Sequence, residues 1–131
     1  MKKYILLLVI ATLISCGKTP INGDLDGRWQ LMKVEYHTTK EAMTPEFTYF
    51  DVNLHLMQLK KIVGGTDRPN GISARFTHTE DSLFIQTIHS TKTAVRLFGL
   101  CDTLQHFYVE KLTSKKMILD SDSSRLEFRK F

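Results

Sequence analysis

Apolar and polar residues alternate in short runs along most of this chain. Such alternation is typical of a β-strand with one buried face, whereas a helix repeats its apolar positions every three or four residues. The stretch 49–58 is the clearest case, with Phe50, Val52, Leu54 and Leu56 on one predicted face. We predict strands over residues 28–36, 49–58, 72–79, 82–90, 93–98, 105–112, 116–120 and 125–130.

Two of these segments can be placed in register with each other. The runs 72–79 and 82–90 flank Glu80-Asp81, which we predict to be a two-residue hairpin turn. With this turn, most apolar residues of the two strands fall on one side of the sheet, which supports the register. The facing pairs are then His78 with Leu83 and Phe76 with Ile85.

The regular spacing of the short strands indicates the fold class. Residues that favour turns, such as Gly, Asn and Ser, separate the runs, and no segment of this region keeps a helical period. About eight short strands with this punctuation indicate an all-β sandwich or barrel. A chain of 131 residues is long enough for one domain with a modest core and leaves little room for a second.

The N-terminal residues follow a different pattern. A basic head, Met1-Lys2-Lys3, precedes an apolar run from Tyr4 to Ile14 that only Thr12 interrupts. This arrangement predicts a secretory signal peptide. The run is shorter than the ~20 residues needed to cross a bilayer. The alternative, a buried core helix, would carry polar residues at helical spacing.

The end of this run, Leu13-Ile14-Ser15-Cys16, resembles the lipobox of bacterial lipoproteins. The resemblance implies cleavage before Cys16, a diacylglyceryl group on its sulfur, and an acyl chain such as palmitate on its new amino terminus. Several acyl chains hold a protein durably at a membrane, whereas one holds it only marginally. We therefore predict a signal peptide over residues 1–15, a lipidated cysteine with a flexible tether over 16–27, and a folded domain over 28–131.

The predicted anchor places the protein in the bacterial cell envelope. Gly17 follows the cysteine, where many lipoproteins kept at the inner membrane have Asp, so we predict the outer membrane. Loss of Lys2 and Lys3 with the signal peptide lowers the formal net charge from +4 to +2. Export, together with the lack of a clustered basic stripe, argues against nucleic acid as a partner.

A lipidated Cys16 leaves Cys101, the second of the two cysteines, without a disulfide partner. Free cysteine is among the most buried residue types, so a packed thiol is the simplest interpretation. A reactive thiol would need a histidine or a cation beside it. His106 is five residues away, and on a single strand that odd separation puts the two side chains on opposite faces.

Gly27-Arg28-Trp29, at the start of the first predicted strand, resembles the Gly-x-Trp motif that opens lipocalins. The closing stretches 109–119 and 126–131 are similar to the end of small lipocalin-like lipoproteins of Bacteroidetes-type bacteria. The resemblance covers residues 24–131. It implies a small antiparallel up-and-down barrel of about eight strands over residues 28–131, and it implies no agreed ligand or activity.

An eight-stranded barrel has an interior that side chains fill or that holds one small ligand. We predict that the protein binds a small apolar or amphipathic molecule, with apolar walls and a few polar groups. The alternative is a filled barrel that interacts with another envelope protein. Candidate ligand contacts, predicted to point inward, are Phe50, Leu54, Phe76, Ile85, Leu97 and Phe107.

The sequence carries no catalytic or cofactor signature. It lacks a Gly-x-Ser-x-Gly nucleophile elbow, and Gly64-Gly65 is not followed by the Gly-Lys-Ser/Thr of a phosphate loop. In the predicted hairpin, His78 and His89 lie roughly 20 Å apart, too far to share a metal ion. We therefore expect no enzymatic activity, no cofactor and no metal site.

Substitution of Cys16 tests the lipid anchor. Cys16→Ala is expected to leave the chain uncleaved or soluble in the periplasm, because no sulfur remains to carry lipid. Membrane fractionation and metabolic labelling with palmitate measure this, with Cys101→Ala as the control that keeps its label. A processed Cys16→Ala chain that still fractionates with the membrane would contradict the anchor.

Overall fold

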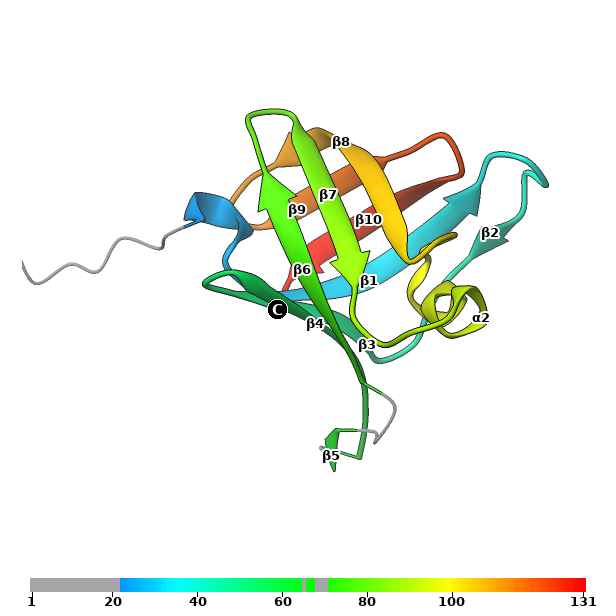
Figure 1. Ribbon diagram of the computed structural model, residues 1–131, viewed down its shortest axis with the longest axis horizontal. Helices are drawn as coiled ribbons and strands as arrows, with labels where there is room; N and C mark the ends of the chain where they lie inside the picture. Colours follow the sequence, from blue (N-terminus) through cyan, green and yellow to red (C-terminus); the bar gives the residue numbers. More distant parts are fainter. Residues whose placement is uncertain (1–21, 65, 68–70) are drawn as a thin grey trace, which may run out of the picture.

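The computed structural model describes residues 22–64, 66–67 and 71–131. Within them the chain forms a closed antiparallel barrel of eight main strands, with two short extra strands and three short helical segments (Figure 1). The elements in chain order are η1 (Gly23–Leu25), β1 (Gly27–Tyr36), β2 (Ala42–Met43), β3 (Thr48–Asn53), β4 (Leu56–Val63), β5 (Thr66–Asp67), β6 (Ile72–His78), β7 (Ser82–Thr87), α2 (Lys92–Val95), η2 (Arg96–Phe98), β8 (Leu104–Leu112), β9 (Lys116–Asp120) and β10 (Ser124–Lys130).

The main strands follow one another around the barrel in chain order, and β1 closes the circle. β1 pairs with β3 along one edge and with β10 along the other, so that Trp29 faces both Phe50 and Lys130. Closure leaves no free edge at either end of this meander. The predicted up-and-down barrel is confirmed.

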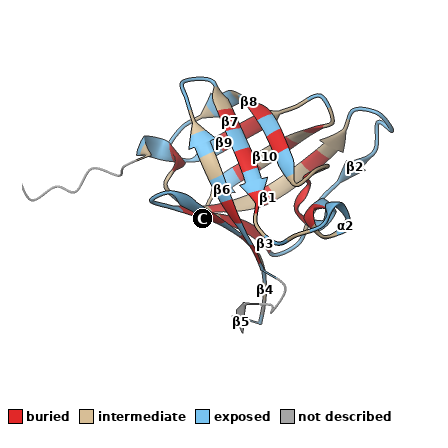
Figure 2. Ribbon diagram, viewed as in Figure 1, coloured by how far each residue is buried: buried red, intermediate tan, exposed pale blue. Residues whose placement is uncertain are grey.

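Side chains fill the barrel interior. Burial alternates along β7 and along the first half of β8, so that every second residue points inward (Figure 2). A side chain lining a space large enough for water would keep some exposed area, whereas the central residues keep none. Those with no exposed area include Trp29, Leu31, Phe50, Met57, Leu59, Ala74, Leu83, Ile85, Phe107, Met117, Leu119 and Leu126.

One end of the barrel is closed by η1 and by three residues that we call the Trp29 latch, namely Leu25, Trp29 and Lys130. The indole Nε1 of Trp29 donates a hydrogen bond of 2.8 Å to the Leu25 carbonyl oxygen. The Lys130 ammonium lies 4.2 Å from the centre of the Trp29 ring and also donates to the carbonyl oxygens of Asp24 and Asp26. Burial is the main cause of the lowered pKa of Lys130.

Residues 22–27 therefore belong to the barrel, and the predicted flexible tether is wrong for that part of 16–27. The cause is the apolar side chain of Leu25, which is buried in the core, and the Asn22 side chain, which donates to the Asp26 carboxylate at 2.6 Å. The rest of the predicted tether, Cys16 and the predicted signal peptide lie outside the described residues.

The opposite end is covered by α2 and η2 (Figure 1). The strand predicted over 93–98 is wrong, because this segment forms short helical turns. Thr91 caps the first turn by accepting from the Ala94 N–H at 3.2 Å. Val95 and Phe98, three residues apart, both point into the core, a spacing that suits a helical turn.

A second correction concerns 49–58, which forms two strands rather than one. β3 and β4 are joined by a tight turn at Leu54-His55, because Asn53 pairs with Leu56. Leu54 adopts a left-handed backbone with φ of 56°, and its carbonyl accepts from the Asn22 side chain at 2.7 Å. The turn lacks the Gly or Asn that usually marks such a hairpin, which explains the error.

The register of the predicted hairpin is confirmed. Phe76 pairs with Ile85 and His78 pairs with Leu83 in the β6–β7 ladder. β7 ends at Thr87, three residues earlier than predicted, and His89 beyond it has a left-handed backbone. The strands predicted over 105–112, 116–120 and 125–130 match β8, β9 and β10 to within one residue.

Gly99 is a position where the fold requires glycine. It ends η2 with φ of 81°, and an added Cβ would lie 2.7 Å from Leu126 Cδ2 and 2.9 Å from Val34 Cγ2. Gly99→Ala is expected to lower the free energy of unfolding by about 2–4 kcal/mol through backbone strain and overpacking.

Urea denaturation measures this loss, with Gly23→Ala as the matched control. Gly23 also has a positive φ, but no atom lies within 4 Å of its added Cβ. Gly23→Ala is expected to lower the free energy of unfolding through backbone strain alone, by about 1–2 kcal/mol. Equal losses in the two variants would contradict the tight contact at Gly99.

Candidate functional site

The six predicted ligand contacts include side chains in the packed interior and side chains exposed outside it. Phe50, Ile85 and Phe107 are fully buried, as predicted, and Phe76 is half-buried beside them. The inward positions predicted for Leu54 and Leu97 are wrong, because these side chains are 54% and 65% exposed. Leu54 sits in the β3–β4 turn and Leu97 on the outer side of η2, so neither follows strand alternation. Ligand binding by any of the six stays a prediction.

The barrel wall opens between the start of β8 and the β9–β10 turn. β8 pairs with β7 from Leu104 onward, but its pairing with β9 begins only at Tyr108, opposite Asp120. The β9–β10 turn, residues 121–123, diverges from the first half of β8. Two adjacent strands that separate in this way leave a gap in the hydrogen-bonded wall.

A pocket of about 470 Å³ occupies this gap, and we call it the β8 groove. It lies on the outside of the barrel, away from the packed interior. The described residues that line it come from the β8 approach, β8, and the β9–β10 turn: Cys101, Asp102, Leu104, Gln105, His106, Tyr108, Asp120, Ser121, Asp122 and Ser123.

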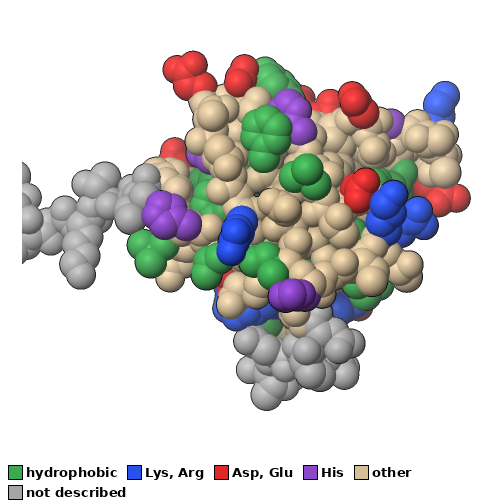
Figure 3. Space-filling model, in the orientation of Figure 1, with side chains coloured by type: hydrophobic (Ala, Val, Ile, Leu, Met, Phe, Trp, Pro, Cys, Tyr) green, Lys and Arg blue, Asp and Glu red, His purple; other side chains and the backbone are tan. Residues whose placement is uncertain are grey.

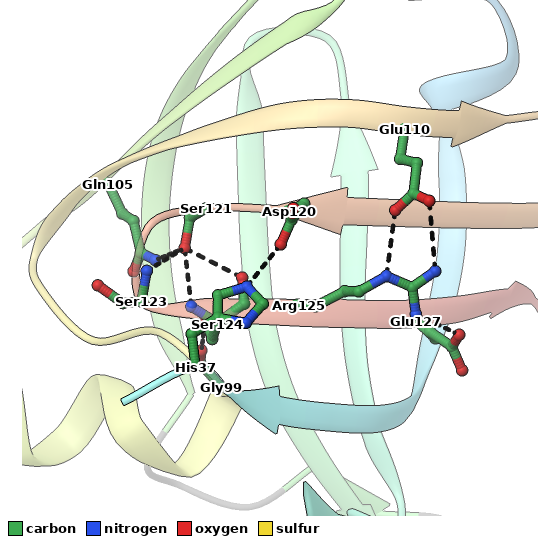
Figure 4. A network of polar contacts seen from close by, with 10 residues as sticks. All are labelled: His37, Gly99, Gln105, Glu110, Asp120, Ser121, Ser123, Ser124, Arg125 and Glu127. Atoms are coloured by element: carbon green, nitrogen blue, oxygen red, sulfur yellow. Dashed lines mark hydrogen bonds and ion pairs between the residues drawn. The ribbon is translucent and has the colours of Figure 1, made fainter. Parts of the chain in front are cut away.

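The floor of the β8 groove is held by Gln105, which is more than nine-tenths buried. Its Oε1 accepts from the Cys101 backbone N–H at 2.8 Å, and its Nε2 donates to Ser121 Oγ at 2.8 Å (Figure 4). Gln105 therefore connects β8 to the turn that no strand ladder reaches. Gln105 was not among the predicted site residues, and its signal in the sequence is a polar residue two positions before Phe107, on the inward face of the same strand.

The β9–β10 turn is held by side chains rather than by glycine. Ser121 Oγ accepts from the backbone N–H groups of Ser123 and Ser124 at 3.2 Å and 3.1 Å. Ser124 Oγ, fully buried, donates to the Gly99 carbonyl at 3.2 Å. The His37 backbone N–H donates to the Ser123 carbonyl at 3.0 Å, so the turn is also bound to the residue after β1.

The rim of the β8 groove is acidic. Asp120 contacts His37 Nε2 at 2.7 Å, and Asp102 lies 3.7 Å from Lys92 Nζ. The pKa of Asp102 is lowered, chiefly because its carboxylate accepts from the Thr103 backbone N–H. Among the ion pairs of the described residues, none includes Asp122.

The outer wall beside the groove is apolar and aromatic. The rings of Phe84 and His106 stack at 4.3 Å with an angle of 9°, and Leu104 and Tyr108 are more than half exposed. Figure 3 shows hydrophobic side chains and a histidine together on this face, over β7 and β8.

A second pocket, of about 440 Å³, lies on the other side of Cys101. It is lined by Tyr36, Arg96 and Ser123 together with residues of the loop after β1. The pKa of Tyr36 is raised, mainly by burial and secondly by the nearby Cys101. Cys101 is half-buried and borders both pockets.

Cys101 and His106 line the same groove, although alternation along a single strand predicted opposite faces for them. The strand argument fails here because Cys101 precedes β8 and is not part of it. No hydrogen bond joins the two side chains in the described structure.

The described residues contain no complete catalytic set. His106 Nε2 lies 3.1 Å from Ser82 Oγ in an exposed position, but no carboxylate among them contacts its other ring nitrogen, as a triad requires. Likewise, no group of three or more His, Cys, Asp or Glu side chains in the described ranges is placed to hold a metal ion.

Helices long and apolar enough to cross a bilayer are absent from the described part of the chain.

Comparisons with known proteins agree on the fold. A family model described as a lipocalin-like domain matches residues 9–131. A crystal structure of a lipocalin-like protein from Bacteroides uniformis is similar, with a TM-score of 0.68 and 19% identity over 83% of this chain and 100% of that one. A crystal structure of an uncharacterized protein from Bacteroides eggerthii has a TM-score of 0.67 and 20% identity, over 81% and 98%. No curated protein matches the chain.

Substitution of Gln105 tests how the groove is held. Gln105→Met keeps the length of the side chain but leaves the Cys101 N–H without its partner and removes the donor that links β8 to Ser121 Oγ. The free energy of unfolding is expected to fall by about 1–3 kcal/mol, as when buried polar groups lose a partner.

The matched control is Gln86→Met, because Gln86 points outward on the neighbouring strand. It is expected to change the free energy by less than about 0.5 kcal/mol. Urea denaturation measures both, and labelling of the Cys101 thiol is expected to be faster only in Gln105→Met. Equal stabilities of the two variants would contradict the bridging role.

Proposed function

The chain belongs to the lipocalin-like domain family, and from this premise we propose that it is a lipid-anchored protein of the bacterial cell envelope that binds partners through its outer surface. The barrel is the rigid support in this proposal, and the β8 groove with its aromatic wall is the contact surface. The signal peptide and Cys16 supply the membrane attachment, and the outer membrane is the proposed location.

We choose the outer surface because of one observation: the central residues of the barrel have no exposed area. Trp29, Phe50 and Phe107 occupy the space that a ligand would need. Opening such a space means removing buried side chains from their contacts, at a cost of about 2–5 kcal/mol for each large residue displaced. The alternative, an apolar or amphipathic ligand in the interior, must overcome this cost.

Family membership supports a binding role over catalysis, because lipocalin-like domains are in general binding folds and not enzymes. The groove supports it further, since it combines exposed apolar side chains with hydrogen-bonding groups around a pocket. No cofactor, metal ion or nucleic acid is part of the proposal.

Native mass spectrometry distinguishes the two sites of binding. The Cys16→Ala chain, purified and incubated with extracted envelope lipids, is expected to carry no stoichiometric apolar ligand, because its interior is filled. The control is the variant Phe107→Ala, which opens space inside the barrel and is expected to bind small apolar molecules if it folds. A lipid retained by the Cys16→Ala chain itself would overturn the proposal in favour of the interior site.

A further inference from the structure

The β8 groove contains an unpaired stretch of strand edge. Thr87 N–H donates to the Thr103 carbonyl at 2.8 Å, and Val109 N–H donates to the Asp81 carbonyl at 2.7 Å. Because the backbone groups of successive residues in a strand point to opposite edges, the odd-numbered residues from 103 to 109 bond toward β7. The N–H and C=O groups of Leu104 and His106 therefore point toward the gap.

Nothing in the described structure pairs with these groups. The β8–β9 ladder begins at Tyr108 opposite Asp120, and the position that would face His106 is Asp122, in the turn. No backbone hydrogen bond joins Asp122 to His106 in the described residues. The groove thus offers donors and acceptors at the spacing of an antiparallel strand, on the outside of a barrel that is otherwise closed.

The side chains that line the groove restrict the chemistry of a ligand that can bind there. Leu104, His106 and Tyr108 project outward on one side, so an added strand would lay alternate side chains beside exposed apolar and aromatic groups. On the other side lie the carboxylates of Asp102, Asp120 and Asp122, and no Lys or Arg is among the described residues that line the groove. Asp102 lies 3.7 Å from Lys92 and Asp120 contacts His37, so Asp122 is the carboxylate that no ion pair among the described residues includes. Charge complementarity favours a cationic occupant.

We propose that the β8 groove binds an extended, basic peptide segment of a partner protein, which adds a short strand to the free edge at Leu104 and His106. This proposal rests on the proposed function and names the partner's chemistry. Backbone hydrogen bonds supply the pairing, and lysine or arginine side chains lie against the acidic rim. The occupant is short, because the ladder resumes at Tyr108.

Fluorescence anisotropy with defined peptides tests the proposal on the full chain. The probe is a short capped peptide of alternating Lys and Val with a fluorescein label. Two peptides are compared with it: one with Glu in place of Lys, and one N-methylated at every internal nitrogen. Each is expected to bind at least about tenfold more weakly, the first through charge repulsion and the second through loss of backbone donors.

Two further measurements locate the binding. Asp122→Asn is expected to weaken binding of the Lys-Val peptide about threefold, and less at high salt, whereas Glu80→Gln in the β6–β7 turn, which is not among the residues that line the groove, leaves it unchanged. The peptide is also expected to slow hydrogen exchange of the Leu104 and His106 amides, seen by NMR, at least about tenfold.

Equal affinity for the N-methylated peptide, no binding of the Lys-Val peptide, or unchanged exchange at Leu104 and His106 would each overturn the proposal. Failure here is distinguishable from failure of the proposed function, which depends on the lipid experiment above. If the chain binds neither the Lys-Val peptide nor lipid, the proposal of a peptide-binding groove is wrong, but the proposed function is not contradicted.

Discussion

The pairing of β1 with both β3 and β10 is the constraint on which the rest of the structure depends. It fixes the circumference of the barrel at eight strands, which is just wide enough for side chains to meet at the centre. Phe50 and Phe128 meet there, and their rings pack edge to face at 4.9 Å. A closed ring of this size with such large inward residues has a packed interior in the described part of the chain.

Two of the strand pairs in the barrel contain an irregularity. β1 carries a bulge between Leu31 and Lys33, and β8 carries another between Val109 and Lys111. Bulges increase the local twist and bend the strand that carries them, and both ladders continue on either side of the bulge. β9 ends at Asp120, opposite Tyr108, so the first half of β8 has no partner in β9, and side-chain bonds from Gln105 and Ser121 hold the turn there instead of a ladder. Arg125, held between Glu110 and Glu127, ties the strands together on the paired side (Figure 4).

The fold could be predicted in those segments that alternate apolar and polar residues regularly and that end in the usual turn residues. The Phe76–Ile85 register followed from alternation alone, because both strands bury one face. The β3–β4 turn was missed because Leu54 takes a left-handed backbone that leucine rarely adopts, and 93–98 was missed because its β-branched residues favour strands locally. The groove was not predictable, since it depends on where pairing between β8 and β9 stops, which no local pattern records.

The Trp29 latch joins residues from the two extremes of the folded chain. Leu25 and Trp29 are among the first described residues and Lys130 is the second to last, yet they contact one another directly. Contacts so distant in sequence form late and slow the search for the native state. Until β10 has been synthesised, the sheet therefore stays open and Trp29 lacks its contact with Lys130. The barrel closes only when β10 pairs with β1, so loss of the Lys130 side chain would leave one end of the barrel without this contact.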